Sequence, residues 1–78
     1  MAKYFFDIVE DGKLRADERG EDFATLADAR REACHGATTI AAERFGDTSA
    51  GSVEVRVRDS QGQPVGRARV TFECSHHS

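Results

Sequence analysis

Four arginines near the C-terminal end are the residues whose type and spacing most directly suggest binding chemistry. Arg56 and Arg58 form one alternating pair and Arg67 and Arg69 form a second, with a turn-like segment between the pairs. Alternate residues of a strand point to the same side, so the four guanidinium groups should share one face of a hairpin. One interpretation is a nucleic-acid surface, on which the arginines contact phosphates and Phe5 stacks on bases.

Acidic residues on the same face favour a simpler explanation. Residues 53–73 set the four arginines against the carboxylates of Glu54, Asp59 and Glu73, and the whole chain has a net charge of −3. Cross-strand ion pairs on a solvated face account for this pattern without a ligand. A chain of this overall charge has no general attraction to nucleic acid, which is therefore the less favoured partner.

A protein-interaction surface is the third interpretation. Phe5 should lie on the arginine side of the sheet, which a single helix would leave uncovered. Aromatic residues beside arginines are typical of protein interfaces. We expect this face to bind a second copy of the chain, as a homodimer, or an unknown protein partner. The predicted contact residues are Phe5, Arg56, Arg58, Arg67 and Arg69.

Cysteine and histidine residues occur in two places but match no metal or catalytic motif. Cys34 and His35 are adjacent on a predicted helix, where neighbouring side chains do not face each other. Cys74, His76 and His77 have a spacing that fits no established zinc or copper site. Two cysteines are too few for a disulfide framework, which favours reduced thiols in a cytoplasmic protein.

No other segment indicates catalysis. The acidic stretch around Asp17, Glu18, Glu21 and Asp22 lacks the ligand pattern of an EF-hand and is expected to be a solvated loop. No phosphate-binding loop, dinucleotide fingerprint or nucleophile elbow is present in the sequence. One helix in so short a chain leaves little room for a deep pocket. We therefore predict a protein that is not an enzyme and uses no metal or cofactor.

Hydrophobic periodicity indicates the segments that position these residues. Residues 4–10 predict an aromatic strand followed by the Asp11-Gly12 turn, and residues 13–17 predict a polar edge strand. Residues 18–24 predict a loop. Residues 25–46 predict a helix capped by Thr25, with an alanine-rich stripe that Phe45 closes and Gly46 ends. Residues 53–59 and 64–74 predict the two strands of a second hairpin, with Pro64 at the start of the second strand.

Two hairpins joined by a helix predict an α+β fold, a two-layer ββαββ sandwich with a four-stranded, mostly antiparallel sheet and one helix on one face. The most apolar strand, residues 4–10, should lie inside the sheet beside residues 53–59, although pairing with the last strand remains open. The 78 residues suffice for one small domain with a frayed tail at 75–78. No stretch is long and apolar enough for a membrane span, and no signal peptide is visible.

The sequence resembles a family of small uncharacterised proteins from rhizobia and related alphaproteobacteria. The matching stretches are "YFF" at 4–6, the Asp11-Gly12 turn, "DERG" at 17–20, "LADARREA" at 26–33 and "DSQGQPV" at 59–65. Two departures are a less acidic segment before Gly20 and Gly66 in place of a larger apolar residue. The resemblance implies a bacterial, cytoplasmic domain of unknown function and carries over no catalytic residue.

Overall fold

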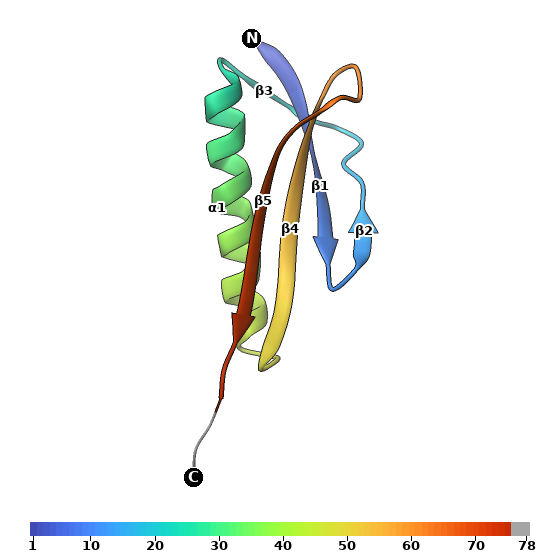
Figure 1. Ribbon diagram of the computed structural model, residues 1–78. Helices are drawn as coiled ribbons and strands as arrows, with labels where there is room; N and C mark the ends of the chain where they lie inside the picture. The colour runs from blue at the N-terminus through green and yellow to red at the C-terminus, as the bar shows by residue number, and fades with distance from the viewer. Residues whose placement is uncertain (76–78) are drawn as a thin grey trace.

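The computed structural model describes residues 1–75 and contains five strands and one helix (Figure 1). The elements are β1 (Ala2–Glu10), β2 (Lys13–Arg15), β3 (Glu21–Phe23), α1 (Leu26–Phe45), β4 (Ala50–Asp59) and β5 (Pro64–Glu73). The strands are antiparallel in the order β2-β1-β4-β5, and β3 also pairs with β1. The predicted α+β class is confirmed, and the first strand lies inside the sheet as expected. Except for Ser75, the tail predicted to be frayed lies outside the described residues.

The predicted count of four strands is wrong by one. Residues 21–23 form β3 instead of a loop, and they pair with Ala2, Lys3 and Tyr4 of β1. β2 is only three residues long and pairs with Ile8, Val9 and Glu10. β3 therefore covers the part of the long β1 edge that β2 does not reach, and the element order becomes βββαββ.

The alanine stripe packs α1 against β4 and β5 on one face of the sheet (Figure 1). Thr25 caps the helix, because its side-chain oxygen accepts a hydrogen bond of 3.1 Å from the Asp28 N–H. The buried residues are Ala29, Ala33, Ala37 and Ala41 of α1, and Val53, Val55, Val57 and Ala68 of the sheet. Such small side chains let the helix lie close to the sheet, but each one buries little apolar area. Within residues 1–75, no helix combines the length and apolar character that crossing a bilayer requires.

One helix residue, Phe45, differs from the expectation. Phe45 does not close the buried stripe: it is 44% exposed, and its ring meets the Phe72 ring edge-on at 5.6 Å between centroids. Position 45 lies on the flank of the stripe, beside the end of β5, and this explains its exposure. Gly36 of the same helix has open space beside it, because a Cβ atom there would meet nothing within 4 Å.

The strand register separates the two faces of the sheet. On the face toward α1, Phe6 lies opposite Val57 and Ile8 opposite Val55. The other face has no helix over it among residues 1–75, and we call it the open face. Its residues on the three long strands are Phe5, Asp7 and Val9 of β1, Glu54, Arg56 and Arg58 of β4, and Arg67, Arg69 and Thr71 of β5.

Candidate binding surface on the open sheet face

All five residues predicted to make contacts lie on the open face. Phe5 is opposite Arg58 in the β1–β4 pair, Arg56 is opposite Arg67 in the β4–β5 pair, and Arg69 is opposite Glu54. Alternation along each strand was sufficient to predict this common face. The surroundings of the five side chains, however, divide them into two groups.

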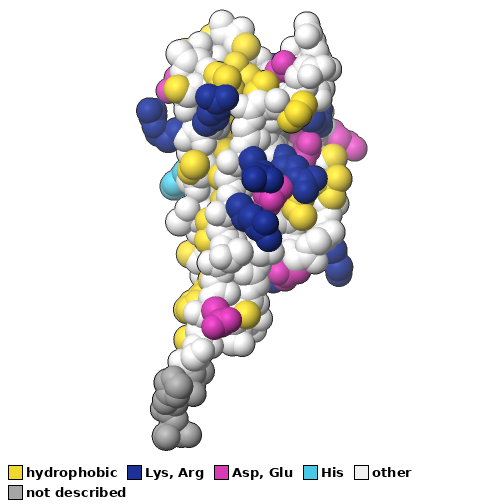
Figure 2. Space-filling view, in the orientation of Figure 1, with side chains coloured by type: hydrophobic (Ala, Val, Ile, Leu, Met, Phe, Trp, Pro, Cys, Tyr) yellow, Lys and Arg dark blue, Asp and Glu magenta, His cyan; other side chains and the backbone are white. Residues whose placement is uncertain are grey.

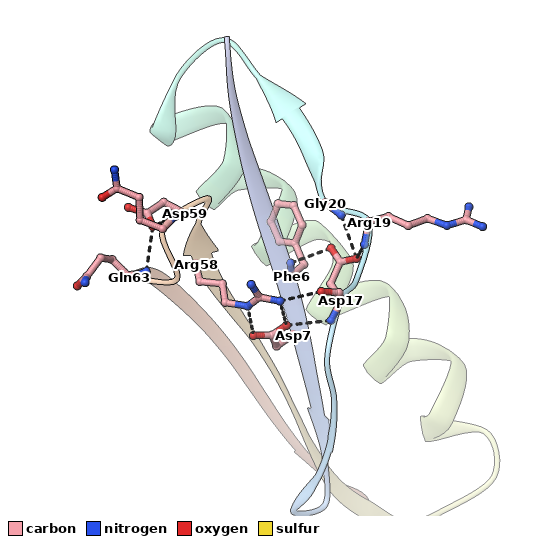
Figure 3. A network of polar contacts seen from close by, with 9 residues as sticks. Phe6, Asp7, Asp17, Arg19, Gly20, Arg58, Asp59 and Gln63 are labelled. Atoms are coloured by element: carbon pink, nitrogen blue, oxygen red, sulfur yellow. Dashed lines mark hydrogen bonds and ion pairs between the residues drawn. The ribbon is translucent and has the colours of Figure 1, made fainter.

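Arg58 and Phe5 belong to a closed network of contacts (Figure 3). The Arg58 guanidinium lies 4.5 Å from the centroid of the Phe5 ring, in a cation–π contact. It donates hydrogen bonds to both carboxylate oxygens of Asp7, at 2.9 and 3.4 Å. A further bond of 2.7 Å runs to the backbone carbonyl of Asp17. Arg58 therefore has its charge balanced by Asp7 and two of its three nitrogens hydrogen-bonded within the chain.

The carboxylate of Asp17 organises the loop between β2 and β3. The carboxylate accepts hydrogen bonds from the backbone N–H groups of Phe6 at 3.1 Å, Arg19 at 3.0 Å and Gly20 at 3.1 Å (Figure 3). The backbone N–H of Asp17 in turn donates to the Asp7 carboxylate at 2.9 Å. Burial alone would raise the pKa of Asp17. The three backbone donors and the Arg58 charge outweigh it and hold that pKa below the usual value of 3.8.

Gly20 brings this loop down onto the open face. Its φ of +70° is a conformation that side chains rarely adopt. A Cβ atom there would come within 2.9 Å of the Phe5 ring and of Lys3 Cγ, and within 3.0 Å of the Tyr4 carbonyl oxygen. Only glycine fits so close to Phe5. The ring of Phe5 is thus half-buried between the loop and Arg58 instead of standing open to a partner.

The second group is Arg56, Arg67 and Arg69, which we call the arginine triad. All three are exposed, and they surround the carboxylate of Glu54 on the open face. Arg56 Nε donates to Glu54 Oε1, and the two side chains are 56% and 12% exposed respectively. Figure 2 shows basic groups gathered around an acidic one on the visible face of the molecule. With one carboxylate among three guanidinium groups, two positive charges are left over.

The triad also controls the ionisation of Glu54. The hydrogen bond from Arg56 lowers the pKa of Glu54, burial opposes this, and the charges of Arg56, Arg67 and Arg69 add to the lowering. The result is a pKa below the usual value of 4.5. The surface therefore already holds one carboxylate in its ionised form, as it would hold a carboxylate or phosphate from another molecule.

The sequence interpretation missed a polar cluster at the end of α1. Arg44 contacts the Asp11 carboxylate, lies 3.7 Å from Glu10, and donates to the Ser52 carbonyl at 3.3 Å. The Asp11 carboxylate also accepts from the Ser52 N–H at 3.0 Å, and these contacts lower its pKa. Asp11 takes a φ of +49°, as expected for the turn with Gly12. These contacts connect the end of α1 to the β1–β2 turn and to β4. The sequence near Arg44 contains no pattern that predicts them.

The two cysteines lie in different parts of the fold, Cys34 within α1 and Cys74 just after β5. Cys34 is an exposed free thiol, Cys74 is half-buried, and His76 and His77 lie outside the described residues. Within residues 1–75, no group of three metal-ligating side chains forms. A hollow of about 170 Å³ between α1 and β1 is lined by Phe6, Ile8, Glu21, Glu32, Gly36, Ile40 and Val55. Its lining offers two carboxylates but no nucleophile.

These features define a small α+β domain with an antiparallel sheet, one helix against one face, and a charged opposite face. The chain belongs to the DUF6894 family, a domain of unknown function, whose model matches residues 3–71. Neither a curated protein nor a solved structure matches the chain. The family confirms the expected class of uncharacterised domain and assigns no role to any residue.

Proposed function

We propose that this protein is a non-enzymatic protein-interaction domain whose arginine triad binds an acidic segment of a partner protein. The observation that carries the proposal is the arrangement around Glu54. One nearly buried carboxylate is surrounded by Arg56, Arg67 and Arg69, and two excess positive charges remain exposed on an uncovered sheet face. A second carboxylate can share these guanidinium donors without removing any contact inside the fold.

The shifted carboxylates support a role in binding. Asp11, Asp17 and Glu54 all have a pKa below the ordinary value, so each stays ionised near neutral pH. A general acid or base working at that pH needs a shift in the opposite direction. The exposed free thiol of Cys34 fits a reducing compartment such as the cytoplasm.

A nucleic-acid partner is the alternative, and two observations weigh against it. Phe5, the only aromatic residue on the arginine face of β1, is engaged by Arg58 and by the loop at Gly20. It therefore does not offer a stacking platform for bases. The same face carries Asp7 beside Arg58, and the chain has a net charge of −3. A nucleic-acid strand would have to run past Asp7 as well as the triad, whereas a short acidic segment can contact the triad alone.

Face-to-face pairing of two copies is also less favoured. Stacking two open faces would bring one arginine triad against another, and like charges across an interface are repulsive. An acidic partner has no such cost.

The test measures binding of two probes by fluorescence anisotropy at the same ionic strength. The probes are a short glutamate-rich peptide and a single-stranded oligonucleotide of similar charge. We expect the peptide to bind, and Arg67→Gln with Arg69→Gln to weaken it by about tenfold or more. Arg19→Gln is the matched control, because its side chain points away from the network in Figure 3. Unchanged peptide binding in the double variant would overturn the proposal, and tighter triad-dependent binding of the oligonucleotide would favour the alternative.

A further inference from the structure

The outer side of β1 pairs with β2 and β3, whereas within residues 1–75 no strand pairs with the outer edge of β5. On the outer side of β1, the chain places β3 against residues 2–4, the Asp17 carboxylate against the Phe6 N–H, and β2 against residues 8–10. β5 is ten residues long. An open edge of this length is a template for pairing with another strand.

The hydrogen-bond register shows which backbone groups face outward from β5. The Cys74 N–H donates to the Ser49 carbonyl at 2.7 Å, so this opposed pair is a hydrogen-bonded one. Hydrogen-bonded and non-bonded pairs alternate along an antiparallel ladder. Gly66, Ala68, Val70 and Phe72 therefore direct their backbone groups to β4. The N–H and C=O groups of Arg67, Arg69, Thr71 and Glu73 point outward.

We propose that β5 pairs with β5 of a second copy of this chain, antiparallel, with the two-fold axis at Val70. This register places Arg67 opposite Glu73 of the second copy, and Arg69 opposite Thr71. All four outward-directed residues then meet outward-directed residues, and two opposite-charge pairs form across the axis. On the other face, Val70 meets its own copy and Ala68 lies opposite the larger Phe72.

Charge and the length of β5 favour this register over its neighbours. With the axis at Arg69, the two Arg69 side chains would lie directly opposite each other, and like charges at such positions are destabilising. With the axis at Thr71, Arg69 would face Glu73 of the second copy, but Arg67 would face Ser75, which is beyond the end of β5, so fewer residues of the strand would pair. Only the Val70 axis gives both Arg67 residues an acidic partner.

The helix leaves room for the second copy. α1 lies over β4 and β5, so a second copy would bring the two helices side by side. Strands are about 4.8 Å apart, which puts the helix axes about 10 Å apart, close to an ordinary packing distance. The side of α1 toward the β5 edge is marked by Arg30, whose Nε donates to the Val65 carbonyl at 3.0 Å. Cys34 and Thr38 follow on the same side and are exposed, and their small side chains permit this approach.

The edge pairing goes beyond the proposed function and does not depend on it. Each copy keeps its open face, and the arginine triads of the two copies would lie on one continuous sheet. Because Glu73→Arg leaves the triad intact, that variant separates the two ideas. It is expected to weaken self-association while the glutamate-rich peptide still binds.

The first experiment is sedimentation equilibrium of the full chain between about 1 μM and about 1 mM. We expect a wild-type dimer, a dissociation constant raised about tenfold or more in Arg67→Glu and in Glu73→Arg, and recovery to within about threefold in the charge-swapped double variant. Arg19→Glu and Glu43→Arg are the matched controls, because they make the same charge changes at exposed sites away from β5. A monomeric wild type, single variants that dimerise normally, or a swap that fails to rescue would each overturn the proposal.

Amide hydrogen exchange gives an independent readout of the same edge. We expect exchange at Arg67, Arg69, Thr71 and Glu73 to slow as protein concentration rises. Exchange at Ala68 and Val70, which already donate to β4, should depend little on concentration. Uniform rates at all these positions, or no concentration dependence at the four outward amides, would contradict pairing at β5.

Discussion

The carboxylate of Asp17 accepts a hydrogen bond of 3.1 Å from the backbone N–H of Phe6, at the point where neither β2 nor β3 pairs with β1. A side chain thus takes the place of a strand carbonyl for one position of the ladder. The same carboxylate holds Arg19 and Gly20, and through them the loop that covers Phe5. This contact links the sheet edge to the shape of the open face.

Asp17→Ala should destabilise the protein by about 2 kcal/mol, because it leaves the N–H of Phe6 and of Gly20 without their charged acceptor. Urea unfolding followed by circular dichroism measures the change. Glu18→Ala is the matched control, since that neighbour is exposed and is expected to change stability by less than about 0.5 kcal/mol. Equal stability of the two variants would show that the Asp17 contacts contribute little.

Stability should fall as the pH is lowered through the acid range. The pKa of Asp17 and of Glu54 is lowered in the folded state from ordinary values of 3.8 and 4.5. The unfolded chain therefore binds protons first, and the contribution of these groups is present above about pH 5 and is lost as the pH falls through the folded pKa values. Urea midpoints measured from pH 7 to pH 3 test this. In Asp17→Asn the decline should be shallower, and an identical decline would exclude Asp17 as a source.

Gly36→Ala should stabilise the protein by about 0.5–1 kcal/mol. Alanine is the better helix former, and a Cβ at this position meets no atom within 4 Å. Gly20→Ala is the informative contrast, because it combines a positive φ with contacts of 2.9 Å to Phe5 and Lys3. It should cost about 1–3 kcal/mol. Thermal melts of both variants measure these changes in stability. Destabilisation by Gly36→Ala would mean that α1 lies too close to its neighbours to accommodate a methyl group at position 36.

Arg58→Lys should destabilise the protein by about 1–2 kcal/mol, since lysine cannot reproduce the two-pronged contact with Asp7 or the planar stacking on Phe5. Arg56→Lys should change stability by less than about 0.5 kcal/mol, because the Arg56 side chain is 56% exposed and solvent weakens its ion pair with Glu54. Chemical denaturation of the two variants side by side separates a structural arginine from a surface one. A larger effect at Arg56 would reverse this assignment.

The helix, the strands β1, β4 and β5, and the common face of Phe5 and the four arginines could all be predicted from the amino-acid sequence alone. These features repeat every two or about 3.6 residues, and neighbouring residues are enough to reveal such a period. The Asp11-Gly12 turn was predictable for the same reason, since the backbone conformation depends on those two residues.

Arg58 is engaged in contacts while Arg67 and Arg69 are exposed, although all three have the same local sequence pattern, and this difference arises from the packing of distant segments. Arg58 finds Asp7 and Asp17 at sequence separations of 51 and 41, and β3 is held by a strand about twenty residues earlier. β3 has two exposed acidic residues among its three and no apolar alternation to detect. The pairing of β3 with β1 depends on contacts between segments that are distant in the sequence, and so does the position of the loop that covers Phe5. A local sequence pattern cannot predict such contacts.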